Sequence, residues 1–127
     1  MSIEKDSIQG VLIKNQSLVL DPDVQQELEQ KGYGEMEKNK LLLKPFESLY
    51  LLYTDKLKIF KEKKNIDFDS LLQIYKKQNE DVLTQFLVYR DLRTRGYTVK
   101  DGFGFGSDFR VYGKGDFGEK GAKFLVF

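Results

Sequence analysis

Cysteine and histidine are both absent from the 127-residue sequence, and each absence removes a class of chemistry. Without cysteine the chain forms no disulfide and no thiolate metal site, which fits a reducing cytoplasm, the location we expect. Without histidine it lacks the commonest general acid or base at neutral pH and the commonest metal ligand. We therefore expect no metal, no cofactor and no histidine-based catalytic triad.

Long apolar runs and a one-sided charge are missing as well. No stretch approaches the roughly 20 apolar residues that span a bilayer, and the opening MSIEKDSIQG is not a signal peptide, so we expect no membrane partner. The net charge of +1 gives no global argument for nucleic acid. From residue 90 onward, eight basic residues stand against five acidic ones, an excess that could meet phosphates or could be an ordinary solvated surface.

The composition is that of a globular domain, since 40% of the residues are apolar and 13% aromatic. Alternation and helical spacing predict strands over residues 8–13, 17–20, 40–43 and 57–60, and helices over 22–31, 68–77 and from 45 onward. Asp21 and Asp67 are the predicted N-caps of two of these helices. The buried face of the helix from residue 45 is predicted to hold Phe46, Leu49, Tyr50 and Tyr53.

The second half is predicted to begin with the longest helix, residues 80–95, which carries so many apolar positions that burial on more than one side is expected. Arginines in its last turns are explained by the helix dipole better than by RNA contact. Strands are predicted over 97–100, 108–112 and 123–127. We place a domain boundary near residue 79 and predict an α+β fold. A small N-terminal α/β domain (1–79) precedes a domain (80–127) whose helix packs on a mainly antiparallel sheet.

Two apparent motifs are better explained by structure than by chemistry. The GFGFG segment at 102–106 is followed by a predicted strand, whereas a dinucleotide fingerprint needs G-x-G-x-x-G between a strand and a helix. The carboxylate pairs Asp21/Asp23 and Asp67/Asp69 each start a helix, where capping accounts for them. We therefore expect neither a nucleotide-binding loop nor a two-carboxylate active site.

The informative stretch is residues 86–112, FLVYRDLRTRGYTVKDGFGFGSDFRVY. It resembles the catalytic domain of the archaeal tRNA-splicing endonuclease (tRNA-intron endonuclease) family, where a helix with LVY(R/K)DLR-RGY leads into VK-G---G-DFRVY. The leucine-rich segment 41–51 and the helix start at 68–71 resemble the small N-terminal domain of that family. The resemblance extends over residues 8–127 and is strongest in the second half.

The resemblance implies a metal-free cut of precursor tRNA, in which a 2′-hydroxyl attacks the adjacent phosphate and leaves 2′,3′-cyclic phosphate and 5′-hydroxyl ends. The family uses a tyrosine as base, a histidine as acid and a lysine for the developing charge. Tyr112 matches the tyrosine, and Arg110, on the same face of the predicted strand, could assist it or hold a structural ion pair. Gly121 stands where the family has histidine, and a lost general acid costs on the order of 10²–10⁴ in rate.

The resemblance places the family lysine in a helix beyond residue 127, and Lys123 is not a substitute, because its position does not match. We predict RNA contacts from Lys100, Arg110 and Lys123. The apolar strand predicted at 123–127 is uncapped, so we expect another chain or further sequence to cover it.

These observations predict a degenerate or shortened unit, incomplete at its C-terminus and inactive alone, that acts on precursor tRNA. Its expected partner is a catalytic endonuclease subunit or a fused homologous unit, in a homo- or hetero-oligomer. Two alternatives stay open. Tyr112 could serve as base in a site that a partner completes, or the chain could be a plain RNA-binding or assembly module.

Overall fold

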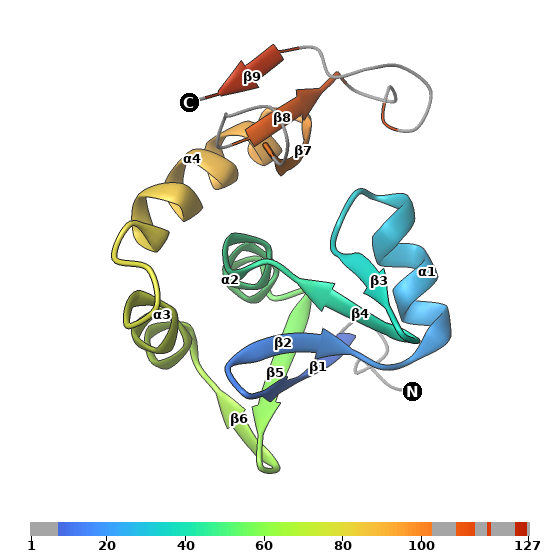
Figure 1. The fold of residues 1–127 in the computed structure, drawn as a ribbon, viewed down its shortest axis with the longest axis vertical. Helices are drawn as coiled ribbons and strands as arrows, with labels where there is room; N and C mark the ends of the chain where they lie inside the picture. Colours follow the sequence, from blue (N-terminus) through green and yellow to red (C-terminus); the bar gives the residue numbers. More distant parts are fainter. Residues whose placement is uncertain (1–7, 103–108, 114–116, 118–123, 127) are drawn as a thin grey trace.

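The computed structural model describes residues 8–102, 109–113, 117 and 124–126 (Figure 1). The helices are α1 (Pro22–Gln30), α2 (Pro45–Tyr53), α3 (Phe68–Lys76) and α4 (Val82–Thr94). The strands are β1 (Ile8–Ile13), β2 (Gln16–Val19), β3 (Glu35–Glu37), β4 (Lys40–Leu43), β5 (Leu57–Lys61), β6 (Lys64–Ile66), β7 (Thr98–Asp101), β8 (Phe109–Tyr112) and β9 (Phe124–Val126). Within this part of the chain, no helix is long and apolar enough to cross a membrane.

The first six strands form one mixed sheet in the order β3-β4-β2-β1-β5-β6. Every neighbouring pair in it is antiparallel except β1 and β5, which run parallel. Strands β7, β8 and β9 form a second, antiparallel sheet. Together with the four helices, these sheets confirm the predicted α+β class.

Three hairpins of the large sheet close through two-residue turns, Lys14-Asn15, Lys38-Asn39 and Glu62-Lys63. Both residues of each turn have positive φ, between 50° and 71°, the geometry of a type I′ turn. This turn matches the right-handed twist of the strands it joins, and Asn tolerates its backbone better than Glu or Lys does. Because β1 and β5 are parallel, the first and third of these turns lie at the same end of the sheet, after the carboxyl ends of these two strands.

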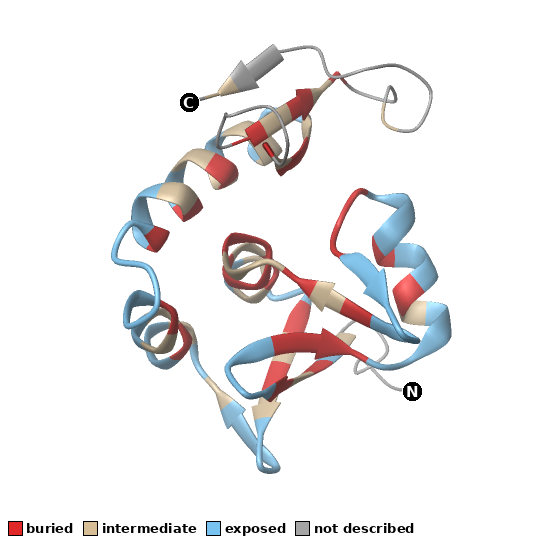
Figure 2. Cartoon of the chain, in the orientation of Figure 1, coloured by how far each residue is buried: buried red, intermediate tan, exposed pale blue. Residues whose placement is uncertain are grey.

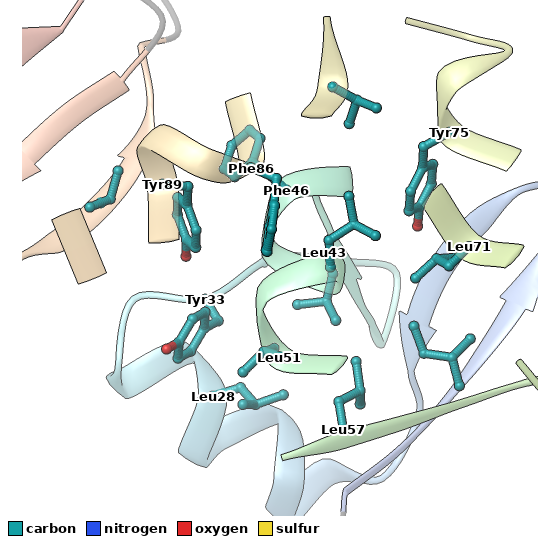
Figure 3. Close-up of a cluster of buried hydrophobic side chains, with 14 of the residues drawn as sticks. Leu28, Tyr33, Leu43, Phe46, Leu51, Leu57, Leu71, Tyr75, Phe86 and Tyr89 are labelled. Carbon is teal, nitrogen blue, oxygen red and sulfur yellow. The ribbon is translucent and has the colours of Figure 1, made fainter. Parts of the chain in front are cut away.

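Helix α2 lies at the centre of the molecule, between the large sheet and α4 (Figure 1). Leu49 and Leu51 are almost completely buried. The Phe46 ring contacts Tyr89 of α4 in a tilted arrangement and Phe109 of β8 edge to face, at centroid distances of 4.9 and 5.0 Å. The buried side chains form one cluster that runs from the large sheet through α2 to the second sheet (Figure 3). The two halves of the sequence therefore share a core.

Most predicted elements are confirmed, and the caps behave as expected: Asp21 Oδ1 accepts from the Asp23 amide at 2.9 Å, and Asp67 Oδ1 from the Ser70 amide at 2.8 Å. Strands β3 and β6 were missed, because each has three residues and a single apolar one, too few to show an alternation. Both are short edge strands with mostly exposed side chains, so little burial constrains their sequence (Figure 2).

Two predictions about burial were wrong. Tyr53, expected inside, is 54% exposed, whereas Glu47 of the same helix is buried. Helix α4 was expected to be covered on more than one side, but Leu83 and Leu87 are 36% and 42% exposed. Helix α4 packs on α2, α3 and β7 through the buried residues Val82, Phe86 and Tyr89, and Val88 and Leu92 are partly buried.

Candidate functional site

Tyr112, the predicted base, ends strand β8 and is paired in register with Thr98 of β7. Its side chain is half-buried, and its ring meets that of Phe117 edge to face at a centroid distance of 5.2 Å. The phenol hydroxyl accepts a hydrogen bond from Arg110 Nη1 at 3.4 Å. The two side chains share a face because they stand two residues apart in a strand.

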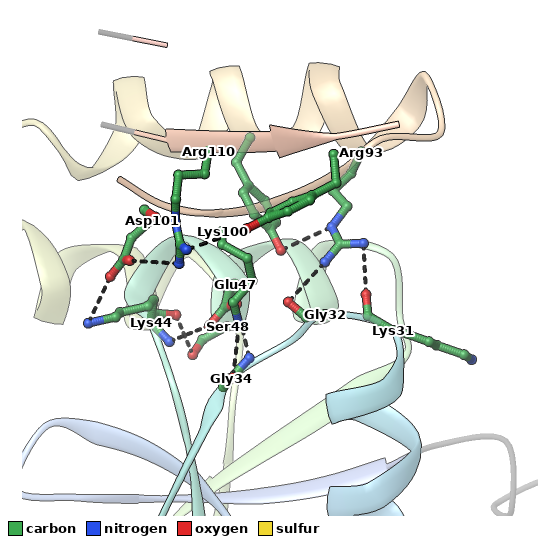
Figure 4. Close-up of polar contacts among 12 residues, drawn as sticks. Lys31, Gly32, Gly34, Lys44, Glu47, Ser48, Arg93, Lys100, Asp101 and Arg110 are labelled. Carbon is green, nitrogen blue, oxygen red and sulfur yellow. Dashed lines mark hydrogen bonds and ion pairs between the residues drawn. The ribbon is translucent and has the colours of Figure 1, made fainter. Parts of the chain in front are cut away.

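Arg110 is held by the strand beside it. Its Nε donates to the Asp101 carbonyl oxygen at 2.7 Å, and its Nη2 lies 3.9 Å from Asp101 Oδ1. The Asp101 carboxylate also pairs at 3.2 Å with Nζ of Lys44, the residue that immediately precedes helix α2 (Figure 4). A polar chain therefore runs from the start of α2, through Asp101 and Arg110, to the Tyr112 hydroxyl.

A second polar connection between the two halves is buried. Glu47, in the first turn of α2, accepts from the backbone amides of Lys44 at 2.8 Å and Gly34 at 3.0 Å. Lys100 Nζ, from β7, lies 3.9 Å from the Glu47 carboxylate and donates to the Gly34 carbonyl oxygen at 2.9 Å (Figure 4). The Glu47 side chain is 1% exposed and that of Lys100 is 11% exposed, so the pair is almost fully removed from water.

Burial raises the pKa of Glu47, because the charged carboxylate loses its hydration. The nearby charge of Lys100 and the two backbone amides oppose that rise, since they stabilise the ionised form. Each partner thus depends on the other, and loss of either leaves an uncompensated buried group.

Arg93 of α4 makes the third connection. Its guanidinium donates to the carbonyl oxygens of Lys31 at 3.1 Å and Gly32 at 3.3 Å, which follow the end of helix α1. It also lies 4.0 Å from the centre of the Tyr33 ring and donates to the Tyr89 hydroxyl at 3.1 Å. The sequence had assigned the arginines to the dipole of their own helix, but Arg93 caps the carboxyl end of a different one.

Glycine is required where these halves meet. At Gly32, with φ of +86°, an added Cβ would lie 2.4 Å from Thr98 Cγ2 on strand β7. The adjoining turn at Gly34, with φ of +75°, supplies the amide and the carbonyl that Glu47 and Lys100 bind. The close approach of α1 to β7 therefore depends on the missing side chain at residue 32.

The structure brings three of the five predicted site residues, Tyr112, Arg110 and Lys100, together on the paired strands β7 and β8. Gly121 and Lys123 lie outside the described residues. The ammonium of Lys100 is engaged by Gly34 and Glu47, and a neighbouring hollow of about 550 Å³ is lined by Lys100 with the carboxylate residues Glu29 and Glu35. An RNA phosphate at Lys100 would have to displace the groups it binds now.

Sequence reasoning did not find Lys44, Glu47 and Asp101. A signal existed for Glu47, because an acidic residue three positions after a helix start often accepts from the cap amide. No local pattern could link it to Lys100, which is 53 positions later in the sequence. Within the described residues, no group of three or more carboxylates could hold a metal ion.

Comparison with known proteins agrees with this geometry. Residues 8–72 match the profile of the tRNA intron endonuclease N-terminal domain, and residues 82–127 match that of the tRNA intron endonuclease catalytic C-terminal domain. The tRNA-splicing endonuclease of Methanococcus vannielii is 38% identical over 128 residues, which cover 99% of this chain and 72% of that protein. The Methanococcus maripaludis protein of the same name is 34% identical over 127 residues, with the same two coverages.

The tRNA-splicing endonuclease of Pyrococcus abyssi is 43% identical over 84 residues, which cover 66% of this chain and 49% of that protein. Similarity to proteins from several archaea thus extends through both halves of the chain, including the block that ends at Tyr112. This chain belongs to the tRNA intron endonuclease family.

Proposed function

We propose that this chain is a unit of a tRNA-splicing endoribonuclease that excises introns from precursor tRNA, and that it does not complete the cut alone. The observation that carries the proposal is a contrast inside one domain. Residues 82–127 match the catalytic domain of the family, yet the chain contains no histidine and has Gly121 where the resemblance places the proton donor. Without that donor, the leaving 5′-oxygen has no positioned acid.

In this proposal the chain has a structural role in a complex. A catalytic subunit or a fused homologous unit supplies the acid and the lysine, and the products carry 2′,3′-cyclic phosphate and 5′-hydroxyl ends. The shared core and the three polar connections support a rigid unit, because they hold the catalytic-like half firmly on the N-terminal half. The predicted RNA contacts of Lys100, Arg110 and Lys123 belong to the same proposal.

A second role is favoured by one contact. The Tyr112 hydroxyl is half-buried rather than enclosed and accepts from Arg110 at 3.4 Å. The contact holds the phenol oxygen in place while leaving it partly open to solvent, and a base must be both positioned and reachable. Tyr112 could therefore act as the base in a site that a partner completes with acid and lysine.

Intron excision by the chain mixed with a histidine-containing catalytic subunit tests both roles. If the chain is structural, the mixture excises introns and Tyr112→Phe leaves the rate unchanged. If Tyr112 is the base, the same substitution abolishes the activity that depends on this chain. Recovery of the tagged chain from its own cells without any endonuclease subunit would instead favour a plain RNA-binding or assembly module.

A further inference from the structure

Two lysines face each other across the β5–β6 hairpin. Lys61 and Lys64 are directly opposite in the strand register, and both side chains are exposed. Like charges in such a pair destabilise a hairpin. The equivalent pair beside the β3–β4 turn is Glu37 with Lys40, which attract each other. The Lys61–Lys64 pair therefore works against the hairpin that carries it, and folding does not explain it.

Three more lysines lie near this pair. Lys63 is in the β5–β6 turn, and Lys58 is earlier in β5. Lys14 is in the β1–β2 turn, which lies at the same end of the sheet. We call these five lysines the lysine edge. Among the described residues, none of the five takes part in an ion pair. Within the two turns, Glu62 is the one acidic residue. The lysine edge thus carries a local positive charge in a chain whose net charge is +1.

An apolar hollow of about 590 Å³ opens beside the lysine edge. Val11, Ile13, Leu20 and Phe60 line it, with Glu62 and Lys63 also in its wall. Ile13 and Leu20 are 46% and 50% exposed, although apolar side chains of this size usually avoid water. Phe60 and Lys58 share one face of β5, since they stand two residues apart, so an aromatic ring and an ammonium group border the same surface. Lys61 and its partner Lys64 lie on the other face, so an RNA strand that contacts all of these groups must pass around the end of the hairpin.

We propose that the lysine edge and this hollow bind an unpaired stretch of the precursor tRNA, with phosphates at the lysines and a base against Phe60. The inference rests on the proposed function, which supplies RNA as the ligand. Clustered lysines gain affinity by releasing counterions from phosphates. An aromatic side chain in an accessible hollow can stack on a base, and bases are free to stack in single strands, loops and bulges rather than within a duplex. The hairpin lies at the opposite end of the molecule from β8 (Figure 1), so this surface is separate from Tyr112.

Binding of the full-length chain to an intron-containing precursor tRNA, measured by fluorescence anisotropy over a range of salt, tests the proposal. The test variant is Lys63→Gln/Lys64→Gln. The matched control is Lys38→Gln/Lys40→Gln, which also removes one turn lysine and one flanking lysine from a two-residue hairpin of the same sheet. We expect the test variant to bind at least about tenfold more weakly and to lower the salt slope by about 2, with little change in the control. Phe60→Leu is expected to weaken binding of a single-stranded RNA by about tenfold and binding of a duplex far less.

Equal affinity of the test and control variants for the precursor tRNA would overturn the proposal. So would an undiminished salt slope in the test variant. If the lysine edge binds an acidic protein and the test variant keeps its affinity for RNA, the ligand of this surface is a protein and the proposal is overturned. The intron-excision assay separates this failure from failure of the proposed function. Excision by the wild-type mixture, with the test variant binding RNA normally, removes the inference and keeps the function.

Discussion

Lys100 Nζ lies 3.9 Å from the Glu47 carboxylate, and the two residues belong to opposite halves of the chain. This buried pair ties the strand beside the Tyr112-bearing strand to helix α2. Its burial makes each charge dependent on its partner, and that dependence leads to two measurable consequences.

The first concerns stability at neutral pH. Replacing Lys100 with methionine (Lys100→Met) leaves the Glu47 carboxylate buried without its cation, which should lower the free energy of unfolding by about 3–5 kcal/mol. Urea unfolding followed by circular dichroism measures this. Lys31→Met is the control, because its pair with Glu27 has both side chains more than half exposed and should contribute under about 1 kcal/mol. A loss at Lys100 no larger than that of the control would show that the pair does not hold the halves together.

The second concerns pH. The folded-state pKa of Glu47 is raised above its ordinary value of 4.5, so the folded chain takes up this proton at a higher pH than the unfolded chain. The stability contributed by that proton is present at acid pH and is lost as pH rises through the folded-state pKa. Lys100→Met removes the charge that lowers this pKa, and the pKa should rise further. The destabilisation by Lys100→Met should therefore be smaller near about pH 4 than near about pH 7. A constant difference in unfolding free energy across that range would contradict this explanation.

Arg93 should be far more sensitive than its neighbour Arg95. Arg93→Ala removes bonds to two carbonyl oxygens and the stack on Tyr33, a loss of about 2–3 kcal/mol of unfolding free energy. Arg95→Ala breaks only a solvent-exposed pair with Asp91 and should cost below about 1 kcal/mol. Arg93→Lys should not restore stability, because an ammonium group cannot reproduce the planar fork of donors. Thermal unfolding of the three variants checks the order, and full rescue by lysine would refute the role of that fork.

The lysine pair on the β5–β6 hairpin predicts a conflict between stability and binding. Lys64→Glu turns a repulsive cross-strand pair into an attractive one, and should raise the unfolding free energy by about 0.2–1 kcal/mol. The same change should weaken binding to precursor tRNA. Chemical unfolding and RNA titration on one protein sample measure both quantities. A variant that loses stability would show that Lys61 and Lys64 do not repel each other in the folded chain.

The sequence was sufficient to predict structural features that depend on a local signal. Asp21 and Asp67 cap their helices, and the strand at Lys40–Leu43 has the predicted bounds, because these features depend on neighbouring residues. It was insufficient for the short edge strands β3 and β6, whose residues bury little surface. The same holds for Glu47 and Arg93. Glu47 pairs with Lys100 and Arg93 bonds to the Lys31 carbonyl oxygen, and each of these partners is more than 50 positions away, a relationship that no periodicity encodes.

The predicted site shows the same division. Tyr112 and Arg110 share a face because strand alternation is local, and the structure brings them into contact. The support of Arg110 by Asp101 and Lys44 could not be read from the sequence, since Lys44 approaches through the packing of α2 on the second sheet. Leu83 and Leu87 of α4 looked like core residues because the pattern gives their apolarity but does not say which face another element covers.

The dependence of this chain on a partner can be measured by cleavage of an intron-containing precursor tRNA with the purified chain, alone and mixed with a histidine-containing catalytic subunit. We expect no cut at the intron boundaries by the chain alone. We expect the mixture to release the intron and to leave 2′,3′-cyclic phosphate and 5′-hydroxyl ends. Excision at both boundaries by the chain alone would show that it needs no partner.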